Sequence, residues 1–553
     1  MTEDAKSKIA RMGQPEALAK AEPLKWSAGL GTDVWELFCA AIAGDTAAIR
    51  QLLEKDPGLV RSAYDYRTPL YFAVRENQLA AAALLIGHGA NPVDSGTPDT
   101  LLQIARDRGH VEMEALLQSA LGKSEGQPGG ERIAEAIRSR DLSQVKQWLD
   151  EKPELVHARD EHSNQPIHWA VMTRQPDMID ELLRRGADID ARRADGAQPV
   201  QLVNGDYHFR GWMHDFPVRP IEILDHLRAK GALIDICTAA WTGDLDRVQE
   251  LLRQDPSLAN QVSPYTSYYI GSGAPLKNAA ARGHFAIVEL LLEYGADPNL
   301  REEGIAPHGH ALYAAVSNGH IAIVKLLLEH GAVPNPEVES SADALSIAMS
   351  RNDQPMIELL CMHGAARAVH MLAYYGDTPT AAAVFAADPS LARDVYALEC
   401  AATEGKESFV RLMLHYQPEL ARRIAVGVRS QGPDASVKSR ELAEFLFSQG
   451  MNAGHRGWLG ITPLHRFAQR GDTENALLFI RHGADLHARD EELSSTPLGW
   501  AAKYGKTAMV KLLLEQGAST NLPDDPDWAT PLAWAMRRGH AEIVTLLQQH
   551  GAV

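Results

Sequence analysis

The chain has 553 residues, 45% of them hydrophobic and 23% charged, so it is long enough for several domains or a long array of repeats. Asp and Glu outnumber Lys and Arg by 72 to 54, and the net charge of -18 disfavours general binding to the phosphate backbone of nucleic acids. The four cysteines are scattered without a CxxC pair, which predicts neither a disulfide framework nor a zinc knuckle.

Residues 1–32 form an N-terminal extension before the first regular pattern. The segment MTEDAKSKIARMGQPEALAKAEPLKW is charged and lacks the apolar core of a signal peptide. No run in the chain approaches the 18 apolar residues that a membrane-spanning helix needs. We therefore expect no secretion signal, no membrane span and, by default, a cytoplasmic location.

From residue 33 onward, pairs of short helical patterns alternate with turns. The pattern is clearest in ITPLHRFAQRGDTENALLFIRHGADLHARD, STPLGWAAKYGKTAMVKLLLEQGASTN and ATPLAWAMRRGHAEIVTLLQQHGAV, whose turn glycines lie 34 residues apart. Thr-Pro begins the first helix, because proline loses no hydrogen bond in a first turn, and the Gly of Gly-Ala suits a left-handed helix end. Counting backwards predicts about sixteen repeats, with turns at Gly44, Asn77, Gly109, Arg140, Arg174, Tyr207, Gly243, Gly283, Gly319, Asn352, Gly376, Gly405, Lys438, Gly471, Gly505 and Gly539.

This repeat resembles the ankyrin repeat, which has a period of about 33 residues and carries T-P-L-H-x-A. The motif, the spacing and the closing G-A-D-x-N recur together, and the resemblance covers nearly all of the chain after Trp35. One helix pair cannot bury its apolar face alone, whereas stacked pairs share a continuous core. The resemblance implies an all-α solenoid of stacked helix-turn-helix repeats with short β-hairpin fingers.

Variations in the repeat divide the array into blocks. Some repeats end in sequences such as DPSLA instead of HGAD, and two follow the preceding repeat without room for a finger. The polar, Gly-rich segment 121–130 has the composition of a flexible linker. We expect one superhelix in four ankyrin blocks, at 33–120, 131–235, 236–365 and 366–553.

Three consecutive repeats are longer than the others. A regular repeat has 12 residues between its turn and the Gly that ends its second helix, but the sixth has 24, from Tyr207 to Gly231. This difference predicts an inserted loop at 204–220. The next two repeats have enlarged fingers at 261–274 and 301–310. Because insertions in repeat arrays often lie on the binding face, we expect these loops to wall a cavity.

The inserted loops are rich in aromatic and titratable side chains. Aromatic rings offer apolar faces with a polar edge, and His, Asp and Lys offer charge and acid–base chemistry. We predict ligand contacts from Tyr207, Arg210, Trp212, Trp241, Tyr265, Tyr268, Tyr269, Lys277, His308 and His310. The candidates for catalysis are Asp206, His208, His214 and Asp215. Alternatively, Trp212, Phe216 and the tyrosines fill a widened junction between repeats.

Six histidines fit structural positions of the repeat. His308-Gly-His310 is the nearest approach to a metal pair, since H-x-H in an extended segment places both imidazoles on one face. Nothing in the sequence brings a third ligand to them, so we predict no metal and no cofactor. The resemblance implies structural roles for the histidines at the TPLH and Gly-His positions, His168, His284, His320, His370, His465 and His540.

Two features lie next to the turns of later repeats. Tyr374-Tyr375 and Lys503-Tyr504 precede their turns, on a face through which ankyrin proteins often bind partners. Arg470, Arg537 and Arg538 form a small basic stripe, which we interpret as an exposed helix end of mixed charge.

Two functions fit these patterns. The resemblance implies a non-enzymatic protein that binds a protein or peptide partner through its concave groove and finger loops. The alternative is an enzyme or a receptor for a small polar ligand, such as a saccharide, built by loops 204–217, 263–272 and 303–310. The concentration of aromatic and charged residues between Tyr207 and His310 supports the alternative. Neither function involves nucleic acid or a membrane, and the sequence leaves catalysis and the oligomeric state open.

Overall fold

The computed structural model describes residues 3–92, 95–122, 129–160, 163–193, 196–205, 216–263, 269–339, 341–424 and 439–552. Within these ranges the chain forms short α-helices and 3-10 turns and no β-strand. The predicted all-α solenoid is confirmed. The fingers are tight turns, and the described ones include isolated bridges, such as Tyr64–Arg67 and Glu302–Ala306, rather than strand ladders. No helix in these ranges is both long enough and apolar enough to cross a bilayer.

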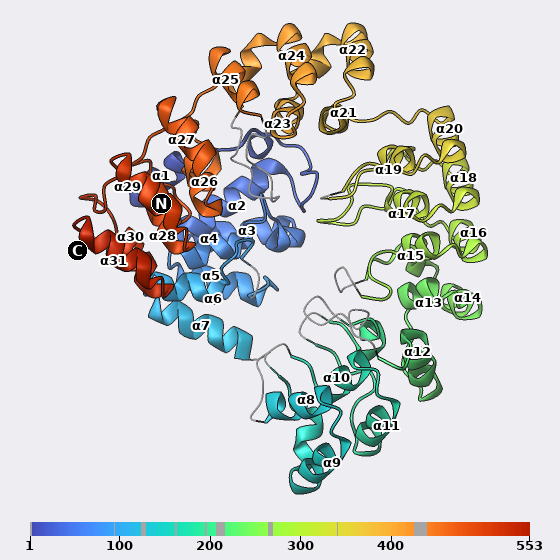
Figure 1. The fold of residues 1–553 in the computed structure, drawn as a ribbon. Coiled ribbons are helices and arrows are strands. Elements are labelled where there is room, and N and C mark those ends of the chain that lie inside the picture. The colour runs from blue at the N-terminus through green and yellow to red at the C-terminus, as the bar shows by residue number, and fades with distance from the viewer. Residues whose placement is uncertain are drawn as a thin grey trace. The chain divides into compact units, whose positions relative to one another are not determined.

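The helices group into two compact units, unit 1 with residues 1–116 and 367–553 and unit 2 with residues 117–366 (Figure 1). In unit 1 they are α1 (Glu3–Met12), α2 (Gly31–Ala43), α3 (Thr46–Lys55), α4 (Pro69–Arg75), α5 (Leu79–Gly87), α6 (Leu101–Asp107), α21 (Val369–Tyr375), α22 (Thr378–Ala387), α23 (Val395–Thr403), α24 (Glu407–Tyr416), α25 (Arg440–Ser448), α26 (Pro463–Arg470), α27 (Thr473–Arg481), α28 (Pro497–Lys503), α29 (Thr507–Glu515), α30 (Pro531–Arg537) and α31 (Ala541–Gln549). Helix α7 (Val111–Gly122) crosses the border between the units.

Unit 2 continues the same helix pairs. They are α8 (Gly130–Arg138), α9 (Leu142–Glu151), α10 (Pro166–Met172), α11 (Pro176–Arg184), α12 (Pro220–Ala229), α13 (Ile236–Thr242), α14 (Leu245–Gln254), α15 (Pro275–Arg282), α16 (Phe285–Glu293), α17 (His310–Asn318), α18 (Ile321–Glu329), α19 (Ala344–Ser350) and α20 (Gln354–Met362). The four predicted blocks stay a prediction. The borders of the compact units, after Leu116 and Ala366, lie near the expected linker and the expected boundary at 365.

Short 3-10 helices join some of the pairs. They are η1 (Glu16–Ala19), η2 (Pro57–Arg61), η3 (Pro153–His157), η4 (Pro199–Leu202), η6 (Pro256–Asn260), η7 (Pro389–Arg393), η8 (Pro418–Arg422), η9 (Trp458–Gly460) and η10 (Asp527–Ala529). The DPSLA-type sequences form η2, η3, η6, η7 and η8. In η6 the carboxylate of Asp255 accepts a hydrogen bond from the Ser257 backbone N–H (2.9 Å), which explains the acid before the proline.

The turn positions agree with the register read from the sequence. At every predicted turn that the structure describes, φ lies between 53° and 82°, the left-handed region. Most of these residues are glycines, which adopt this conformation without a Cβ clash. Asn77, Arg140, Arg174 and Asn352 adopt it with a side chain. Tyr207 and Lys438 lie outside the described residues.

The first helices of successive pairs pack more closely than the second helices do. In unit 2 the first helices α13, α15 and α17 meet through buried alanines such as Ala240, Ala280 and Ala315, whereas α16 and α18 carry leucine-rich faces. Because small side chains let backbones approach closely, the stack curves with its first helices on the concave side. Figure 1 shows α13, α15, α17 and α19 in one row and α14, α16, α18 and α20 in another.

In unit 1, repeats from the two ends of the chain pack against each other. Arg67, in an N-terminal finger, forms an ion pair with Glu492, in a C-terminal finger, and their side chains are only 3% and 5% exposed. Arg538 donates to Asp107 at 2.7 Å, and Lys503 pairs with Asp99. A stack that contacts only its sequence neighbours does not predict this closure.

These contacts correct the interpretation of the C-terminal basic stripe. Arg538 is not part of an exposed helix end, because its guanidinium is largely buried against Asp99 and Asp107. Arg537, which is itself exposed, also donates to the backbone carbonyl of Asp107. Arg537 and Arg538 therefore belong to the contact between the chain's two ends.

Glu76 makes the closure region sensitive to acid. Its carboxylate lies 2.6 Å from Arg75 Nε and 2.8 Å from Lys8 Nζ, and it is nearly buried. Burial raises the pKa of Glu76, but Arg75 and Lys8 outweigh it and lower the pKa to about 2. The folded pKa is thus below the unfolded value, so this stabilisation is fully present above about pH 4.5 and is lost as the pH falls toward 2.

We predict that lowering the pH from 5 to 2 reduces the free energy of unfolding less in Glu76→Gln than in the native chain. Urea unfolding at the two pH values measures this reduction. The two proteins should differ in it by about 3 kcal/mol, since each pKa unit corresponds to about 1.4 kcal/mol. Glu542→Gln, which removes an exposed carboxylate from α31, should retain the native pH dependence. Equal pH dependence in all three proteins would contradict the assignment to Glu76.

Candidate functional site

The predicted site is only partly described. The structure describes Trp241, Tyr269, Lys277, His308 and His310. The other predicted residues lie outside the described ranges and stay predictions, namely Asp206, Tyr207, His208, Arg210, Trp212, His214, Asp215, Tyr265 and Tyr268.

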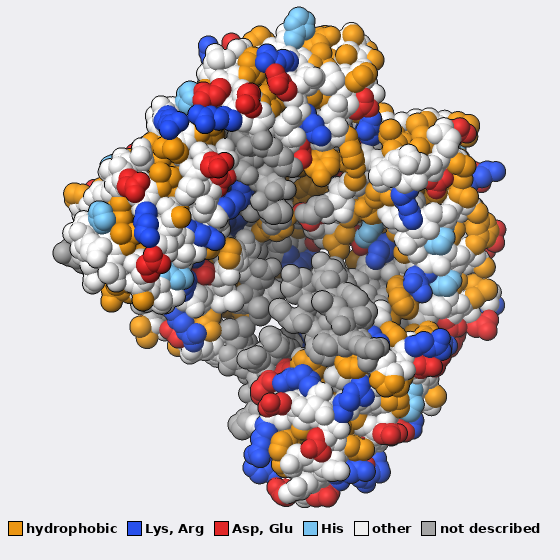
Figure 2. All heavy atoms as spheres, viewed as in Figure 1, with side chains coloured by type: hydrophobic (Ala, Val, Ile, Leu, Met, Phe, Trp, Pro, Cys, Tyr) orange, Lys and Arg blue, Asp and Glu red, His pale blue; other side chains and the backbone are white. Residues whose placement is uncertain are grey.

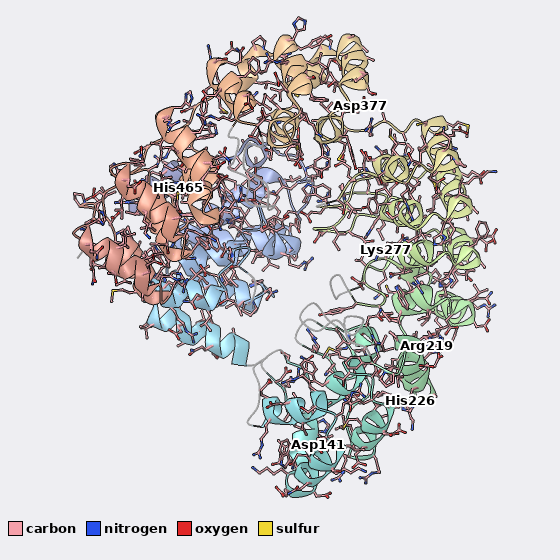
Figure 3. All side chains as sticks on the ribbon, in the orientation of Figure 1. Asp141, Arg219, His226, Lys277, Asp377 and His465 are labelled. Atoms are coloured by element: carbon pink, nitrogen blue, oxygen red, sulfur yellow. The ribbon has the colours of Figure 1, made fainter. Side chains whose placement is uncertain are left out.

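Glu302, a carboxylate that the sequence pattern did not indicate, lies beside His310 and interacts electrostatically with Lys277. Glu302, in the finger before α17, is 2% exposed, and its Oε1 lies 3.0 Å from Nδ1 of His310, the first residue of α17. Lys277 lies on the neighbouring first helix, α15, and its ammonium donates to the Ser272 carbonyl at 3.0 Å (Figure 3). The enlarged finger at 301–310 thus places the buried carboxylate of Glu302 against His310 at the start of α17. The same carboxylate accepts from the Ala274 N–H at the start of α15, the helix that carries Lys277.

The charges of this cluster depend on one another. Burial lowers the pKa of Lys277, and the carboxylate of Glu302 opposes that shift. Burial raises the pKa of Glu302, but His310 and Lys277 outweigh it, so the net pKa is lowered. On α13, burial raises the pKa of Cys237 well above its usual value. Glu302 is therefore an ionised carboxylate that stabilises the positive charge of Lys277 in a largely water-excluded place.

The cluster contains polar atoms without a hydrogen-bond partner among the described residues. Glu302 Oε2 is such an atom, and the helix that carries Lys277 has a second in the buried amide nitrogen Nδ2 of Asn278. Buried polar atoms of this kind are uncommon, because each one loses its hydrogen bonds to water. Gly273 keeps the space beside Glu302 open, since a Cβ there would lie 2.7 Å from Oε2. In the described ranges, no group of three His, Cys, Asp or Glu side chains is placed to hold a metal ion.

The described aromatic residues near the insertions contact arginines. The Arg282 guanidinium lies 4.5 Å from the Trp241 ring centre, and Arg193 donates to the Tyr269 hydroxyl at 3.2 Å. Phe216, at the end of the inserted loop, lies under two turn residues, with Arg140 at 4.8 Å and Arg174 at 5.5 Å. This end of the loop therefore packs against preceding repeats, as the junction-filling alternative expects for Phe216.

Comparison with known families identifies the repeats. A model for ankyrin repeats in three copies matches residues 236–338, 435–524 and 464–553, and a single-repeat ankyrin model matches 65–97 and 162–194. Together these matches cover more than half of the chain. The chain belongs to the ankyrin-repeat family. This membership indicates a role in protein interaction.

Curated relatives share only segments with this ankyrin protein. A probable E3 ubiquitin-protein ligase of Oryza sativa subsp. japonica, XBOS32, is 44% identical over 66 residues, 12% of each chain. Palmitoyltransferase ZDHHC13 of Mus musculus is 27% identical over 200 residues, 32% of each chain. Palmitoyltransferase akr1 of Emericella nidulans is 28% identical over 116 residues, 21% of this chain and 15% of the relative. The matches thus span about a third or less of each relative.

The ankyrin histidines have structural roles. In His168, Nδ1 accepts from the Gln165 backbone N–H at 2.9 Å, and Nε2 lies 3.0 Å from the Ala191 carbonyl of the next finger. His465 bridges Thr462 and Ser495 in the same way, and burial lowers its pKa to about 3. His284, in a Gly-His turn, places Nε2 3.2 Å from the Trp241 carbonyl of the preceding repeat. These roles confirm the prediction for the three residues.

We predict that Glu302→Gln lowers the free energy of unfolding by about 2 kcal/mol, because it removes the buried negative charge that lies 3.0 Å from His310 Nδ1 and accepts from the Ala274 N–H. The neighbouring exposed carboxylate gives a matched control, and Glu303→Gln should change stability by less than about 0.5 kcal/mol. The double variant Glu302→Gln/Lys277→Met should recover part of the loss. Urea denaturation at pH 7 measures all three, and equal losses from Glu302→Gln and Glu303→Gln would contradict the cluster.

Proposed function

We propose that this ankyrin protein binds a protein or peptide partner through its concave row of first helices and its finger loops. The observation that supports this most directly is a set of three exposed tyrosines, the tyrosine patch: Tyr374 and Tyr375 at the end of α21 and Tyr396 at the start of α23. These side chains are 49%, 42% and 50% exposed. Helices α21 and α23 are first helices of adjacent repeats and pack against each other, so the patch lies on the row that the family uses for partners.

The patch has the chemistry of a binding surface. Tyr374 and Tyr375 meet edge to face with ring centres 5.2 Å apart, and His370 lies 5.2 Å from the Tyr396 ring. Elsewhere in unit 1, large aromatic side chains such as Phe385 and Phe409 are fully buried. Exposed tyrosines supply large apolar contact area and a hydroxyl with few rotatable bonds, which is why tyrosine is enriched at the centres of protein interfaces.

The test compares two positions of one repeat. A photo-crosslinking amino acid at position 374 should form adducts with a partner protein in a cell extract. The same group at position 391, in η7 behind the second helix, should not. Leu391 is 43% exposed, so both positions are accessible. With the partner purified, Tyr374→Ala and Tyr396→Ala should each raise Kd at least about tenfold, whereas Leu391→Ala should leave it unchanged.

Crosslinking that is equal at positions 374 and 391, or a Kd that tolerates both tyrosine variants, would reject this surface. Unchanged thermal unfolding of the variants shows that a loss of binding is not a loss of folding. We expect unchanged unfolding because exposed side chains usually contribute little to stability.

A second candidate function is binding or conversion of a small polar ligand at the cluster of Lys277, Glu302 and His310. It would lie beside the loops 204–217, 263–272 and 303–310. The observation that favours it is Glu302 Oε2, a buried carboxylate oxygen without a partner among the described residues, on a carboxylate that interacts electrostatically with Lys277. Saccharide hydroxyls would accept from Lys277 and donate to Glu302. If the site is catalytic, Glu302 and His310 are placed for proton transfer.

A thermal-shift screen with mono- and disaccharides tests this second function. A ligand should raise the melting temperature of the native chain, because it binds only the folded state. The shift should disappear in Lys277→Met and persist in Lys325→Met, which removes an exposed ammonium from α18. If the melting temperature of Lys277→Met still rises with the ligand, the ligand binds elsewhere. If no saccharide raises the melting temperature of the native chain, saccharides are excluded as ligands of this site.

A further inference from the structure

We propose that unit 1 contains a binding site for a small, multiply phosphorylated molecule, in a basic cavity between repeats from the two ends of the chain. The cavity has a volume of about 560 Å³. Small-molecule sites usually have volumes of roughly 300–1,000 Å³, so a nucleotide-sized ligand fits. The proposal is independent of the tyrosine patch and of the Lys277 cluster.

The walls of the cavity collect positive charge. Six cationic side chains line it, Lys8, Arg11, Arg75, Arg108, Arg456 and Arg489. Only three carboxylates accompany them, Glu76, Asp490 and Glu491. The chain as a whole has a net charge of -18, and Figure 2 shows basic and acidic side chains interspersed over the visible surface. Asp525, outside the lining, pairs with Arg489, so an excess of two positive charges remains here, a local departure from the net negative charge of the chain.

The cations come from both ends of the chain. Lys8 and Arg11 lie on α1, Arg75 ends α4 and Arg108 follows α6. Arg456 and Arg489 lie in C-terminal fingers, before η9 and before α28. An anion in the cavity would therefore contact both groups of repeats and hold them together.

The half-buried Arg108 and the exposed Arg456 have no ion-pair partner among the described residues, whereas Arg11 pairs with Glu491 at 2.5 Å and Arg489 with Asp525 at 2.6 Å. Glu76 serves both Arg75 and Lys8. Arg108 donates to the Glu492 carbonyl and Arg456 to the Arg489 carbonyl, both at 2.7 Å. No carboxylate in the described ranges lies within ion-pair distance of either guanidinium. By contrast, the charge of Arg67 in the same unit is neutralised by a buried ion pair with Glu492.

Buried guanidinium nitrogens without partners also indicate an excess of positive charge in the cavity. Arg75 Nη1 and Arg489 Nε have no hydrogen-bond partner among the described residues, and the Arg75 side chain is almost completely buried. Burial and the neighbouring Arg75 lower the pKa of Arg108, which means that its charge is disfavoured by its surroundings. An added anion would stabilise all of these charges at once.

Phosphate is the anion that this set of donors recognises best. Guanidinium groups bind phosphate oxygens through two parallel hydrogen bonds, and five of the six cations are arginines. The cations lie on several elements around the cavity, so a ligand with more than one phosphate reaches more of them than a single phosphate does. Trp528 also lines the cavity, under the Arg108 guanidinium at 4.3 Å, and offers an apolar surface to an organic moiety.

The experiment uses the full chain and inorganic tripolyphosphate as the probe. Isothermal titration calorimetry in about 0.1 M NaCl, where the Debye length is about 10 Å, should give a Kd on the order of 10 µM. Arg456→Gln and Lys8→Gln should each weaken binding about tenfold, because they remove a cation from opposite ends of the chain. Arg50→Gln, which removes an exposed arginine from α3 in the same unit, should bind like the native chain.

Three outcomes overturn the proposal. They are no heat of binding at millimolar tripolyphosphate, native affinity in Arg456→Gln and Lys8→Gln, and equal stabilisation by sulfate at the same ionic strength. Circular dichroism and thermal unfolding of each variant confirm that it is folded. Titration with ATP and with inositol hexakisphosphate then separates the two sources of such a ligand. Tighter binding of ATP than of tripolyphosphate assigns a nucleotide, and tighter binding of inositol hexakisphosphate assigns a polyol phosphate.

Discussion

The structure depends on the sharing of apolar surface between neighbouring helix pairs. A pair such as α15–α16 has too few residues to enclose a core of its own, so each pair is stable only against the next. The alanine-rich contacts of the first helices set a short spacing on one side, and the leucine-rich second helices set a longer spacing on the other. Curvature, a concave row of first helices and a line of fingers all follow from this one difference in side-chain size.

A stack of this kind leaves an apolar face uncovered at each end. In unit 1 the terminal repeats cover each other, and ion pairs such as Arg67 with Glu492 fix the contact. Buried ion pairs contribute less to stability than to specificity, because desolvation of both charges offsets much of their attraction. The closure therefore specifies which repeats meet, while the hydrophobic core supplies most of the free energy.

The candidate sites lie where the regular pattern changes. The Lys277 cluster exists because an enlarged finger turns back far enough to bury Glu302 beside α15. The tyrosine patch exists because Tyr374 and Tyr375 occupy the solvent side of a first helix, at positions where most other repeats carry polar or charged residues. The basic cavity exists because two distant groups of repeats meet without filling the space between them. In each place the regular repeats position the site, and residues that depart from the repeat pattern provide its polar, charged or aromatic groups.

The sequence by itself determined the fold class and the register, because both depend on local physics. Gly or Asn at a left-handed turn and Pro in a first helical turn depend only on nearby residues, and the described turns agree with that reading. It also selected Lys277 and His310 as candidate site residues, but not Glu302, because nothing local distinguishes a carboxylate in a polar finger from its exposed neighbour Glu303. The partner of Arg538 lies more than 400 residues away. Only the tertiary structure decided the closure of unit 1, the burial of Glu302 and the basic cavity, since each depends on contacts between residues far apart in the chain.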